Sequence, residues 1–352
     1  MSAGITSLAL HFPTRLRPNQ YWRDNYPEMV ANAENSIVNK VWAAIDDDHP
    51  IFDEAMKKYL SDPFRGVQNR HWLEEGQSSL SIEVAAAKKA IAARGIDVRD
   101  IDLLLCSSFF PDEISTGNAA FVARDLGLTG NAWNLESACS SSNVALATAA
   151  ALVDAGQYRS VLCVVSCSYS RVCPETDSLS WSVGDGAAAF IVEKLPDGFG
   201  VLSTFGRHTG DTCGAITVKP TRDGDDVALS MVVHPETGRI FRSTSSKNLR
   251  YCVQGALERI DASIEDVAFF VFNTPAAWYG EFCQKTLDID ANKTISVHHL
   301  YANTGPVLMP SNLFHALADK RIHAGDLVCL YSVGSVSSSA ATLMRWSDCS
   351  LG

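Results

Sequence analysis

Short apolar segments rich in β-branched residues alternate along the chain with longer segments in which small apolar residues recur at a helical spacing. In the first half we expect strands at residues 4–12, 101–110, 160–169 and 187–192. Helices are expected between them at residues 81–94 and 144–153. Strands that alternate with helices predict an α/β fold.

A turn at Pro196-Asp197-Gly198 marks a boundary near the middle of the chain. After it, strands are expected at residues 200–205, 227–233, 267–272, 294–298 and 327–331. We therefore expect two halves of similar layout, residues 1–196 and 197–352, although no sequence repeat relates them. Residues 18–65 are mixed helical and acidic, and they are expected to form an excursion over the surface of the first half.

Composition narrows the class of protein. The chain has 352 residues, of which 46% are hydrophobic and 20% charged, which predicts a globular protein with a large core. Its apolar runs are strand-sized, so no membrane span is expected. The amino terminus lacks the pattern of a secretory signal, so we expect a cytoplasmic protein.

Charge and cysteine usage exclude further classes. A net charge of -11 argues against a nucleic-acid-binding protein, which would need a basic surface. The ten cysteines follow no framework spacing and several lie in apolar runs, so disulfides are not expected. One basic stretch is either a solvated helix face or a docking patch for an acidic partner or a phosphate-bearing substrate, and it contains Arg239, Arg242, Lys247 and Arg250.

Cys139 is a candidate nucleophile. It follows an apolar segment and precedes the helix expected at residues 144–153, so it would lie near the positive end of the helix dipole. A thiolate is stabilised there and the pKa of the thiol falls. The local sequence fits a buried structural cysteine equally well.

A cysteine nucleophile needs an oxyanion hole and a group that helps the proton to move. Gly334 follows an expected strand, and its backbone N–H is a candidate oxyanion donor. The polar candidates are His298, His299, Asn273 and Asn303; neighbouring histidines on a strand point to opposite faces, so at most one should face the site. Their spacing is poor for a metal, and no glycine-rich phosphate loop is present, so we expect neither metal nor nucleotide cofactor.

Several segments together resemble the thiolase-like ketoacyl-ACP synthase III family, including its acyltransferase relatives in natural-product pathways. The resemblance covers most of the chain outside residues 18–62, and its motifs keep the family's order. They are Gly66-Val67-Gln68-Asn69-Arg70-His71, Glu136-Ser137-Ala138-Cys139-Ser140, the segments at residues 171–177 and 183–189, and Tyr301-Ala302-Asn303-Thr304-Gly305.

The resemblance implies a five-layered α/β/α/β/α fold of two similar halves, usually homodimeric. Cys139 would accept an acyl group from the thioester of CoA or of an acyl-carrier protein, with no further cofactor. Asn303 corresponds to the family's catalytic asparagine, and Gly334 together with the Cys139 backbone corresponds to its oxyanion hole. Arg70 of the first motif is expected to contribute to substrate binding.

One departure from the family bears on the reaction. Where its catalytic histidine opens a His-Gln-Ala-Asn type motif, this chain has Asn273-Thr274-Pro275-Ala276. An amide donates a hydrogen bond but is no base at ordinary pH, so decarboxylative condensation is in doubt. Acyl transfer to an alcohol or amine would instead use His298 or His299 as the base, with His299 favoured because it lies four residues before Asn303.

Three functions therefore stay open from the sequence. The first is an acyltransferase of a specialised-metabolite pathway that works through acyl-Cys139. The second is carbon–carbon condensation with a malonyl or β-ketoacyl thioester, and the third is a catalytically silent synthase-like partner subunit.

Thr116 stands near the place where the family puts a bulky residue that closes the acyl pocket across the dimer, so we expect room for a wider acyl group.

Overall fold

Two sheets of different size organise the molecule. The computed structural model describes residues 2–40, 50–223, 226–334 and 338–352. The larger sheet has the strand order β14-β1-β7-β6-β4-β5, formed by β14 (Ser350–Leu351), β1 (Ala3–His11), β7 (Asp185–Lys194), β6 (Ser160–Ser168), β4 (Leu103–Phe109) and β5 (Asn131–Asn134). The smaller sheet has the order β11-β12-β13-β8, formed by β11 (Phe269–Phe272), β12 (Leu327–Val333), β13 (Ser338–Arg345) and β8 (Gly200–His208).

The two sheets repeat one topology. In the first, β1 is antiparallel to β7, β7 is antiparallel to β6, and β6 is parallel to β4. In the second, β8, β13, β12 and β11 repeat these three relationships in the same order. The two halves are therefore similar, and the expected boundary at residues 196–197 falls in the loop between β7 and β8. The strand β14 returns from the end of the chain to pair with β1.

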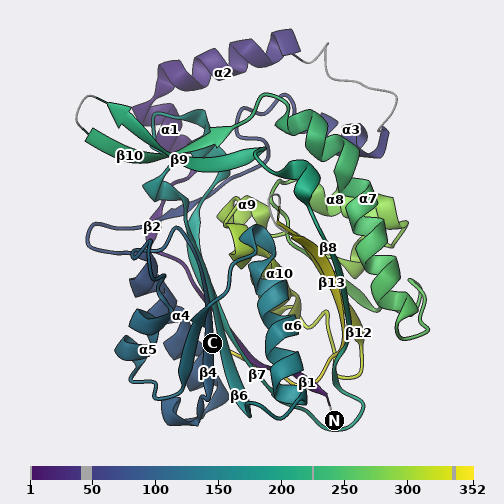
Figure 1. The fold of residues 1–352 in the computed structure, drawn as a ribbon. Helices are drawn as coiled ribbons and strands as arrows, with labels where there is room; N and C mark the ends of the chain where they lie inside the picture. Colours follow the sequence, from purple (N-terminus) through teal and green to yellow (C-terminus); the bar gives the residue numbers. More distant parts are fainter. Residues whose placement is uncertain (1, 41–49, 224–225, 335–337) are drawn as a thin grey trace.

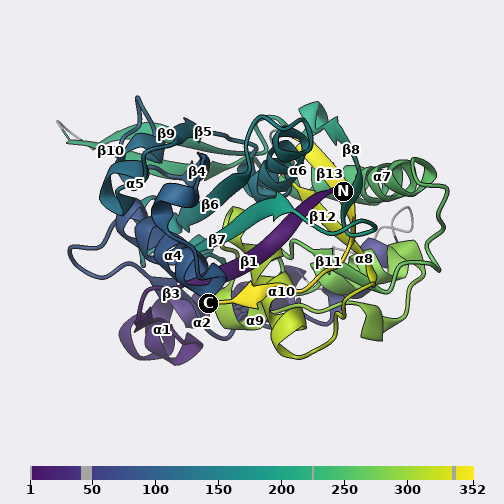
Figure 2. The same cartoon turned by 90° about the horizontal axis from the view of Figure 1, so that it is seen from below.

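Helices complete five layers. Those outside the larger sheet are α4 (Ser79–Arg94) and α5 (Ala119–Leu126), those between the sheets are α6 (Ser141–Asp154) and α10 (Leu308–Ala318), and those outside the smaller sheet are α7 (Thr237–Glu258) and α8 (Tyr279–Leu287). Figure 1 shows these layers side by side, and the view from below places α4 and α7 at opposite sides of the molecule (Figure 2). This is the α/β/α/β/α architecture that the resemblance implied.

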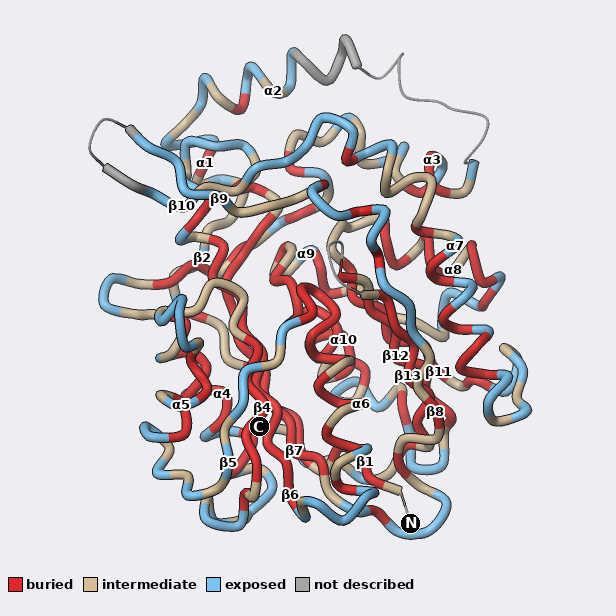
Figure 3. Tube along the Cα trace, viewed as in Figure 1, coloured by how far each residue is buried: buried red, intermediate tan, exposed pale blue. Residues whose placement is uncertain are grey.

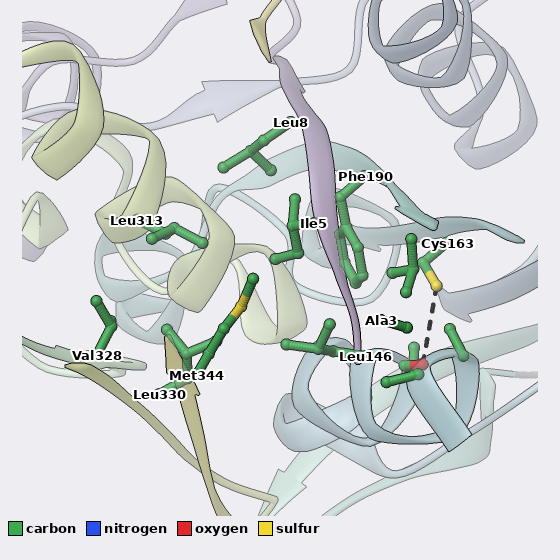
Figure 4. Packing of buried hydrophobic residues seen from close by; sticks show 14 of the residues in the cluster. Ala3, Ile5, Leu8, Leu146, Cys163, Phe190, Leu313, Val328, Leu330 and Met344 are labelled. Atoms are coloured by element: carbon green, nitrogen blue, oxygen red, sulfur yellow. Dashed lines mark hydrogen bonds between the residues drawn. The ribbon is translucent and has the colours of Figure 1, made fainter. Parts of the chain in front are cut away.

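The central layer carries the main hydrophobic core. Side chains of β1, α6 and α10 meet strands of the smaller sheet there, as Ile5, Leu146, Leu313 and Leu330 do in Figure 4. Burial follows the layers, because the strands and the inward faces of the helices are buried while the connecting loops are exposed (Figure 3). After its polar first turn, helix α6 consists mostly of small apolar residues, as expected for a helix covered on both sides.

The excursion at residues 18–65 is less superficial than expected. It contains α1 (Asn19–Asn25), α2 (Pro27–Lys40) and α3 (Pro50–Lys57), and its residues 41–49 lie outside the described part of the chain. Trp22 is fully buried beside Phe64 and Trp72. Phe52 packs on Trp278 and Phe282 of the second half. The excursion therefore contacts both halves.

Smaller elements connect these layers. Two-stranded sheets are formed by β9 (Ile216–Asp223) with β10 (Asp226–Val233) and by β2 (Arg15–Leu16) with β3 (His71–Trp72). Single 3-10 turns occur at Val98–Asp100, Ala138–Ser140, Tyr169–Arg171, Ser178–Ser182, Gly210–Thr212, Ala291–Lys293 and Gly305–Val307. The described residues include no helix long and apolar enough to cross a membrane.

The prediction of a strand at residues 294–298 is wrong. Thr294 forms only an isolated bridge with Phe270, and the helix α9 (His298–Tyr301) begins at the first histidine. A tertiary contact sets this turn, because the Val297 N–H donates to Asn312 Oδ1 of α10 at 2.9 Å. Both histidines therefore lie on a helical turn rather than on opposite faces of a strand.

Candidate active site

A tight turn carries Cys139 from the end of β5 into α6. Ala138 adopts a left-handed conformation with φ +50°, which is costly for a residue with a side chain and is typical of functional turns. Buried hydrogen bonds hold this turn: the Ser137 N–H donates to Ser141 Oγ at 2.8 Å, and Ser140 Oγ donates to the Ser137 carbonyl at 2.6 Å. Cys139 is buried at the start of α6, between the two sheets.

The prediction that the thiol of Cys139 has a lowered pKa is wrong. Burial, followed by the nearby Glu136 carboxylate, raises its pKa to about 12. The Tyr169 hydroxyl and the Cys139 backbone N–H act in the opposite direction. Desolvation of the charged form therefore outweighs the helix end, and the resting residue is a thiol.

Gly334 approaches this turn closely, but its N–H points elsewhere. It donates to the Ser338 carbonyl at 2.7 Å, so the expected oxyanion donor is already engaged. A Cβ at position 334 would overlap the Ser137 carbonyl oxygen. Glycine is required there because the end of β12 lies against the nucleophile turn.

Asn303 reaches the site from the second half. Ala302 before it has φ +57° and ψ -159°, a combination that costs a non-glycine residue free energy. The side-chain Oδ1 of Asn303 accepts the Gly305 N–H at 2.9 Å, and its backbone forms an isolated bridge with Val183. Because Oδ1 is fixed, the Nδ2 group is left as a donor on the side chain that lines the Cys139 cavity.

Asn273 is placed differently from Asn303. It is fully buried, and its Oδ1 accepts the Val333 N–H at 3.0 Å while its Nδ2 faces the Val333 carbonyl at 3.5 Å. The carboxamide is therefore engaged with the backbone of β12, and Asn273 is not among the residues that line the cavity.

Neither candidate histidine faces Cys139. His298 is buried, its Nδ1 lies 2.8 Å from the Thr274 carbonyl, and burial lowers its pKa to about 4. His299 is exposed, and its carbonyl accepts the N–H groups of Gln68 and Asn69 at 3.0 Å. Neither lines the cavity, so the geometry does not support the base role expected for either residue.

The cavity above Cys139 is enclosed and mainly apolar. Its volume is about 260 Å³, and both halves of the chain and the β9–β10 hairpin contribute to its wall. Apolar side chains form most of it, among them Phe109, Val183, Met231, Phe241 and Trp278. Among the described residues that line it, the ionisable ones are Cys139, Tyr169 and Tyr279.

Known proteins are similar to this chain in sequence and in fold. Residues 133–210 match the family described as 3-Oxoacyl-[acyl-carrier-protein (ACP)] synthase III, and residues 257–346 match its C-terminal region. Beta-ketoacyl-[acyl-carrier-protein] synthase III of Brucella suis (strain ATCC 23445 / NCTC 10510) is 30% identical over 290 residues, which cover 80% of this chain and 88% of that protein. The chain belongs to the 3-oxoacyl-[acyl-carrier-protein] synthase III family.

Solved structures agree on the fold. The synthase III of Pseudomonas aeruginosa PAO1 superposes with a TM-score of 0.79 at 19% identity, covering 98% of each chain. The synthase III of Thermus thermophilus gives 0.79 at 21% identity, covering 98% of this chain and 99% of that chain. The chain therefore has the thiolase-like fold of synthase III enzymes.

Two residues expected to bind substrate lie away from the cavity of Cys139. Arg70 is fully buried: its Nε donates to the Trp181 carbonyl at 2.6 Å and its guanidinium lies 4.8 Å from the Trp22 ring. Burial lowers its pKa to about 9, and it joins the excursion to the first half. Thr116 is exposed on the loop after β4, outside the cavity of its own chain.

Sequence reasoning missed Tyr169. It stands immediately after β6 and opens a 3-10 turn, and its side chain lines the cavity beside Cys139. Its position at the end of a buried strand is a signal that could have found it, since side chains at that edge of a sheet commonly form binding sites. The strand expected at residues 160–169 included Tyr169, so it was treated as a strand residue rather than as a site residue.

Proposed function

We propose that this synthase III relative is an acyltransferase that forms an acyl-thioester on Cys139 from acyl-CoA or an acyl-carrier protein. It then passes the acyl group to an acceptor in a specialised-metabolite pathway. The observation that carries the proposal is that Cys139 and Asn303 both line an enclosed, mainly apolar cavity. An acyl chain suits such a wall, because apolar surface gains free energy when it leaves water.

The proton balance of this reaction needs no base in the cavity. In the first step Cys139 Sγ bonds to the carbonyl carbon, the donor C–S bond breaks, and the Cys139 proton ends on the departing thiol. In the second step the acceptor bonds to that carbon and its proton returns to sulfur. The base in this step is the Cys139 thiolate. Because the pKa of the thiol is about 12, its thiolate is basic enough to accept the proton. The Asn303 Nδ2 and the Cys139 N–H are the proposed donors to the oxyanion.

Carbon–carbon condensation is the second candidate function. Membership of the synthase III family favours it, and loss of CO2 from a malonyl thioester generates a carbon nucleophile without a base. The engagement of Asn273 with Val333 argues against it, since one donor expected for the enolate is directed elsewhere. A silent subunit is disfavoured by the presence of Cys139 in the cavity.

The acyl donor is proposed to approach along α7. A second cavity lined by Arg207, Arg239 and Lys247 shares Thr244 and Asn248 with the cavity of Cys139. Cations at this place suit the phosphates of CoA or of a carrier-protein arm. Arg242 of the same stretch pairs instead with Asp53 at 3.0 Å.

A homodimer is proposed from the exposed apolar side chains around β5. Strand β5 forms the edge of the larger sheet, Trp133 on it is 43% exposed, and Ile114 on the loop after β4 is 76% exposed. Such surface on a soluble chain commonly marks an interface. A cytoplasmic location stays a prediction.

The test is intact-mass measurement after incubation with a panel of acyl-CoA thioesters that includes malonyl-CoA. We expect an acyl adduct in the wild type and in Cys213→Ala, which removes an exposed cysteine, but none in Cys139→Ala. A malonyl adduct that keeps its carboxylate supports acyl transfer. Release of CO2 with a β-ketoacyl product would replace it by condensation, and no adduct with CoA or carrier-bound donors would overturn both.

A further inference from the structure

Ala138 is held on both sides in the turn that carries the nucleophile. Its N–H donates to Glu136 Oε1 at 2.5 Å. Its carbonyl accepts the Ser141 hydroxyl at 2.8 Å and the Ser141 N–H as well. The two peptide groups that flank Ala138 are therefore both restrained, which keeps this residue in its left-handed conformation of φ +50°. Without such contacts alanine favours a negative φ.

The same contacts set the direction of the Cys139 N–H. A peptide group is planar and trans, so its N–H points away from the carbonyl of the preceding residue. Because Ser141 holds the Ala138 carbonyl, the Cys139 N–H keeps one direction. This N–H is one of the two donors proposed for the oxyanion, and such a donor is most effective when it is in place before the reaction.

Glu136 acts on this turn from outside the cavity of Cys139. It is not among the residues that line that cavity, and it lines instead a second cavity that shares Phe109 and Ala138 with the first. Its Oε1 accepts the Ala138 N–H and lies 3.3 Å from Ser141 Oγ. This oxygen is therefore directed at the turn and not at a substrate on Cys139.

The charge of Glu136 does not favour the chemistry of the thiol. Burial is the main cause of the raised pKa of Cys139, and the Glu136 carboxylate is the next. A negative charge disfavours a nearby thiolate. The carboxylate therefore opposes ionisation of sulfur while its oxygen stabilises the turn, and these two effects can be separated by substitution.

We propose that Glu136 is a positioning residue whose carboxylate, together with Ser141, holds Ala138 so that the Cys139 N–H points at the oxyanion. This inference rests on the proposed function. Glu136 neither gives nor takes a proton in either step of acyl transfer. Its hydrogen bond to the Ala138 N–H, and not its charge, is what acylation requires.

The experiment compares two rates at Cys139. One is single-turnover acylation by an acyl-CoA, followed by intact mass, and the other is alkylation by iodoacetamide without acyl substrate, followed by peptide mass. Alkylation forms no oxyanion, so it reports on the sulfur alone. We expect Glu136→Ala to slow acylation on the order of tenfold or more, because an oxyanion donor loses its direction, while alkylation is at least as fast as in the wild type.

Glu136→Gln is the matched variant. Its amide oxygen still accepts the Ala138 N–H while the charge is gone, so acylation should stay close to the wild-type rate. Equal slowing of acylation in the two variants would show that the charge matters and would overturn the proposal. Unchanged acylation in Glu136→Ala, or alkylation that slows as much as acylation, would overturn it too.

A second pair of variants keeps the inference testable if Glu136→Ala fails to fold. Ser141→Ala releases the Ala138 carbonyl from the side chain that holds it, so acylation should slow while alkylation does not. Ser142→Ala is its control, because within the described chain the buried Ser142 hydroxyl has no hydrogen-bond partner. Equal acylation rates in these two variants contradict the proposal.

Failure of the proposed function gives a different result. A wild-type protein that forms no acyl adduct with any donor would overturn that function, and this inference with it. An adduct that forms at the same rate in the wild type, Glu136→Ala and Ser141→Ala would leave the function standing and overturn this inference alone.

Discussion

The carboxamide of Asn273 pairs with the backbone of Val333, with Oδ1 accepting the Val333 N–H at 3.0 Å and Nδ2 lying 3.5 Å from its carbonyl. One residue earlier, β11 and β12 are still joined as parallel strands through Phe272 and Tyr331. The side chain of Asn273 therefore continues the sheet by one step. Since Gly334 follows directly, this pair fixes the chain that lies against the nucleophile turn.

Asn273→Ala should destabilise the fold rather than remove a catalytic group. The backbone groups of Val333 would lose their partners, and a buried group left unpaired costs about 1–3 kcal/mol. Urea unfolding should show this loss, while the folded fraction still takes up an acyl group on Cys139. Unchanged stability combined with lost acylation would contradict the structural role.

Asn303→Ala should lower turnover rather than stability. Its Nδ2 is the donor proposed for the oxyanion, and removal of such a donor typically lowers kcat by about 100-fold or more. Asn303→Asp is the matched control for structure, because its carboxylate still accepts the Gly305 N–H that Oδ1 accepts at 2.9 Å. Both variants should lose turnover alike in a steady-state assay, and normal turnover in Asn303→Asp would show that Nδ2 is not needed.

Gly334→Ala should displace the nucleophile turn. Its Cβ would overlap the Ser137 carbonyl oxygen and approach Ser140 Oγ, and relief of such overlap costs about 1–3 kcal/mol. Acylation of Cys139 by an acyl-CoA should slow more than the loss of stability explains. Gly238→Ala is the control, because its Cβ would enter open space in the first turn of α7 and overlap no other group. Equal acylation rates in the two variants would contradict this role for Gly334.

Glu83→Gln should remove a pH dependence of stability. Glu83 is fully buried, accepting hydrogen bonds from Asn118 at 2.9 Å and Ser166 at 2.5 Å, and burial raises its pKa from 4.5 to about 7. Because the folded state binds the proton more tightly, this group's contribution is fully present below pH 4.5 and is lost as the pH rises through about 7.

The free energy of unfolding of Glu83→Gln, relative to that of the wild type, should therefore rise by up to about 3 kcal/mol between acid and neutral pH. The difference between the two proteins is the quantity to measure by urea unfolding, since burial also raises the pKa of Asp185 to about 6 and acts in the same direction. A constant difference at all pH values would show that Glu83 titrates alike in the folded and unfolded states.

The local pattern of the sequence predicted the alternation of strands and helices and a helix at residues 144–153, within α6, because both depend on neighbouring residues. The strands β1, β4, β6 and β12 follow from the apolar content and β-branched residues of short segments. The family motifs predicted the five-layered fold. Segments with weaker patterns failed: residues 294–298 contain β-branched side chains, yet a contact with α10 turns them into the approach to α9.

The partners of the site residues depended on distant segments and could not be predicted in this way. Asn273 meets Val333 because two strands pair across 60 residues of sequence. The pKa of the Cys139 thiol is raised mainly by its burial, which depends on segments from both halves of the chain and not on the local sequence.

The hairpin of β9 and β10 stands apart from the two large sheets that carry Cys139 and Asn303. It is a two-stranded sheet of its own, and it places Met231 and Val233 on the wall of the cavity. Substitutions along this ribbon can reshape the compartment without disturbing the turn at the nucleophile. The architecture thus separates the residues that shape the cavity from the turn that carries the nucleophile. Related proteins could therefore diverge in the molecule they accept while they keep the same chemistry at the cysteine.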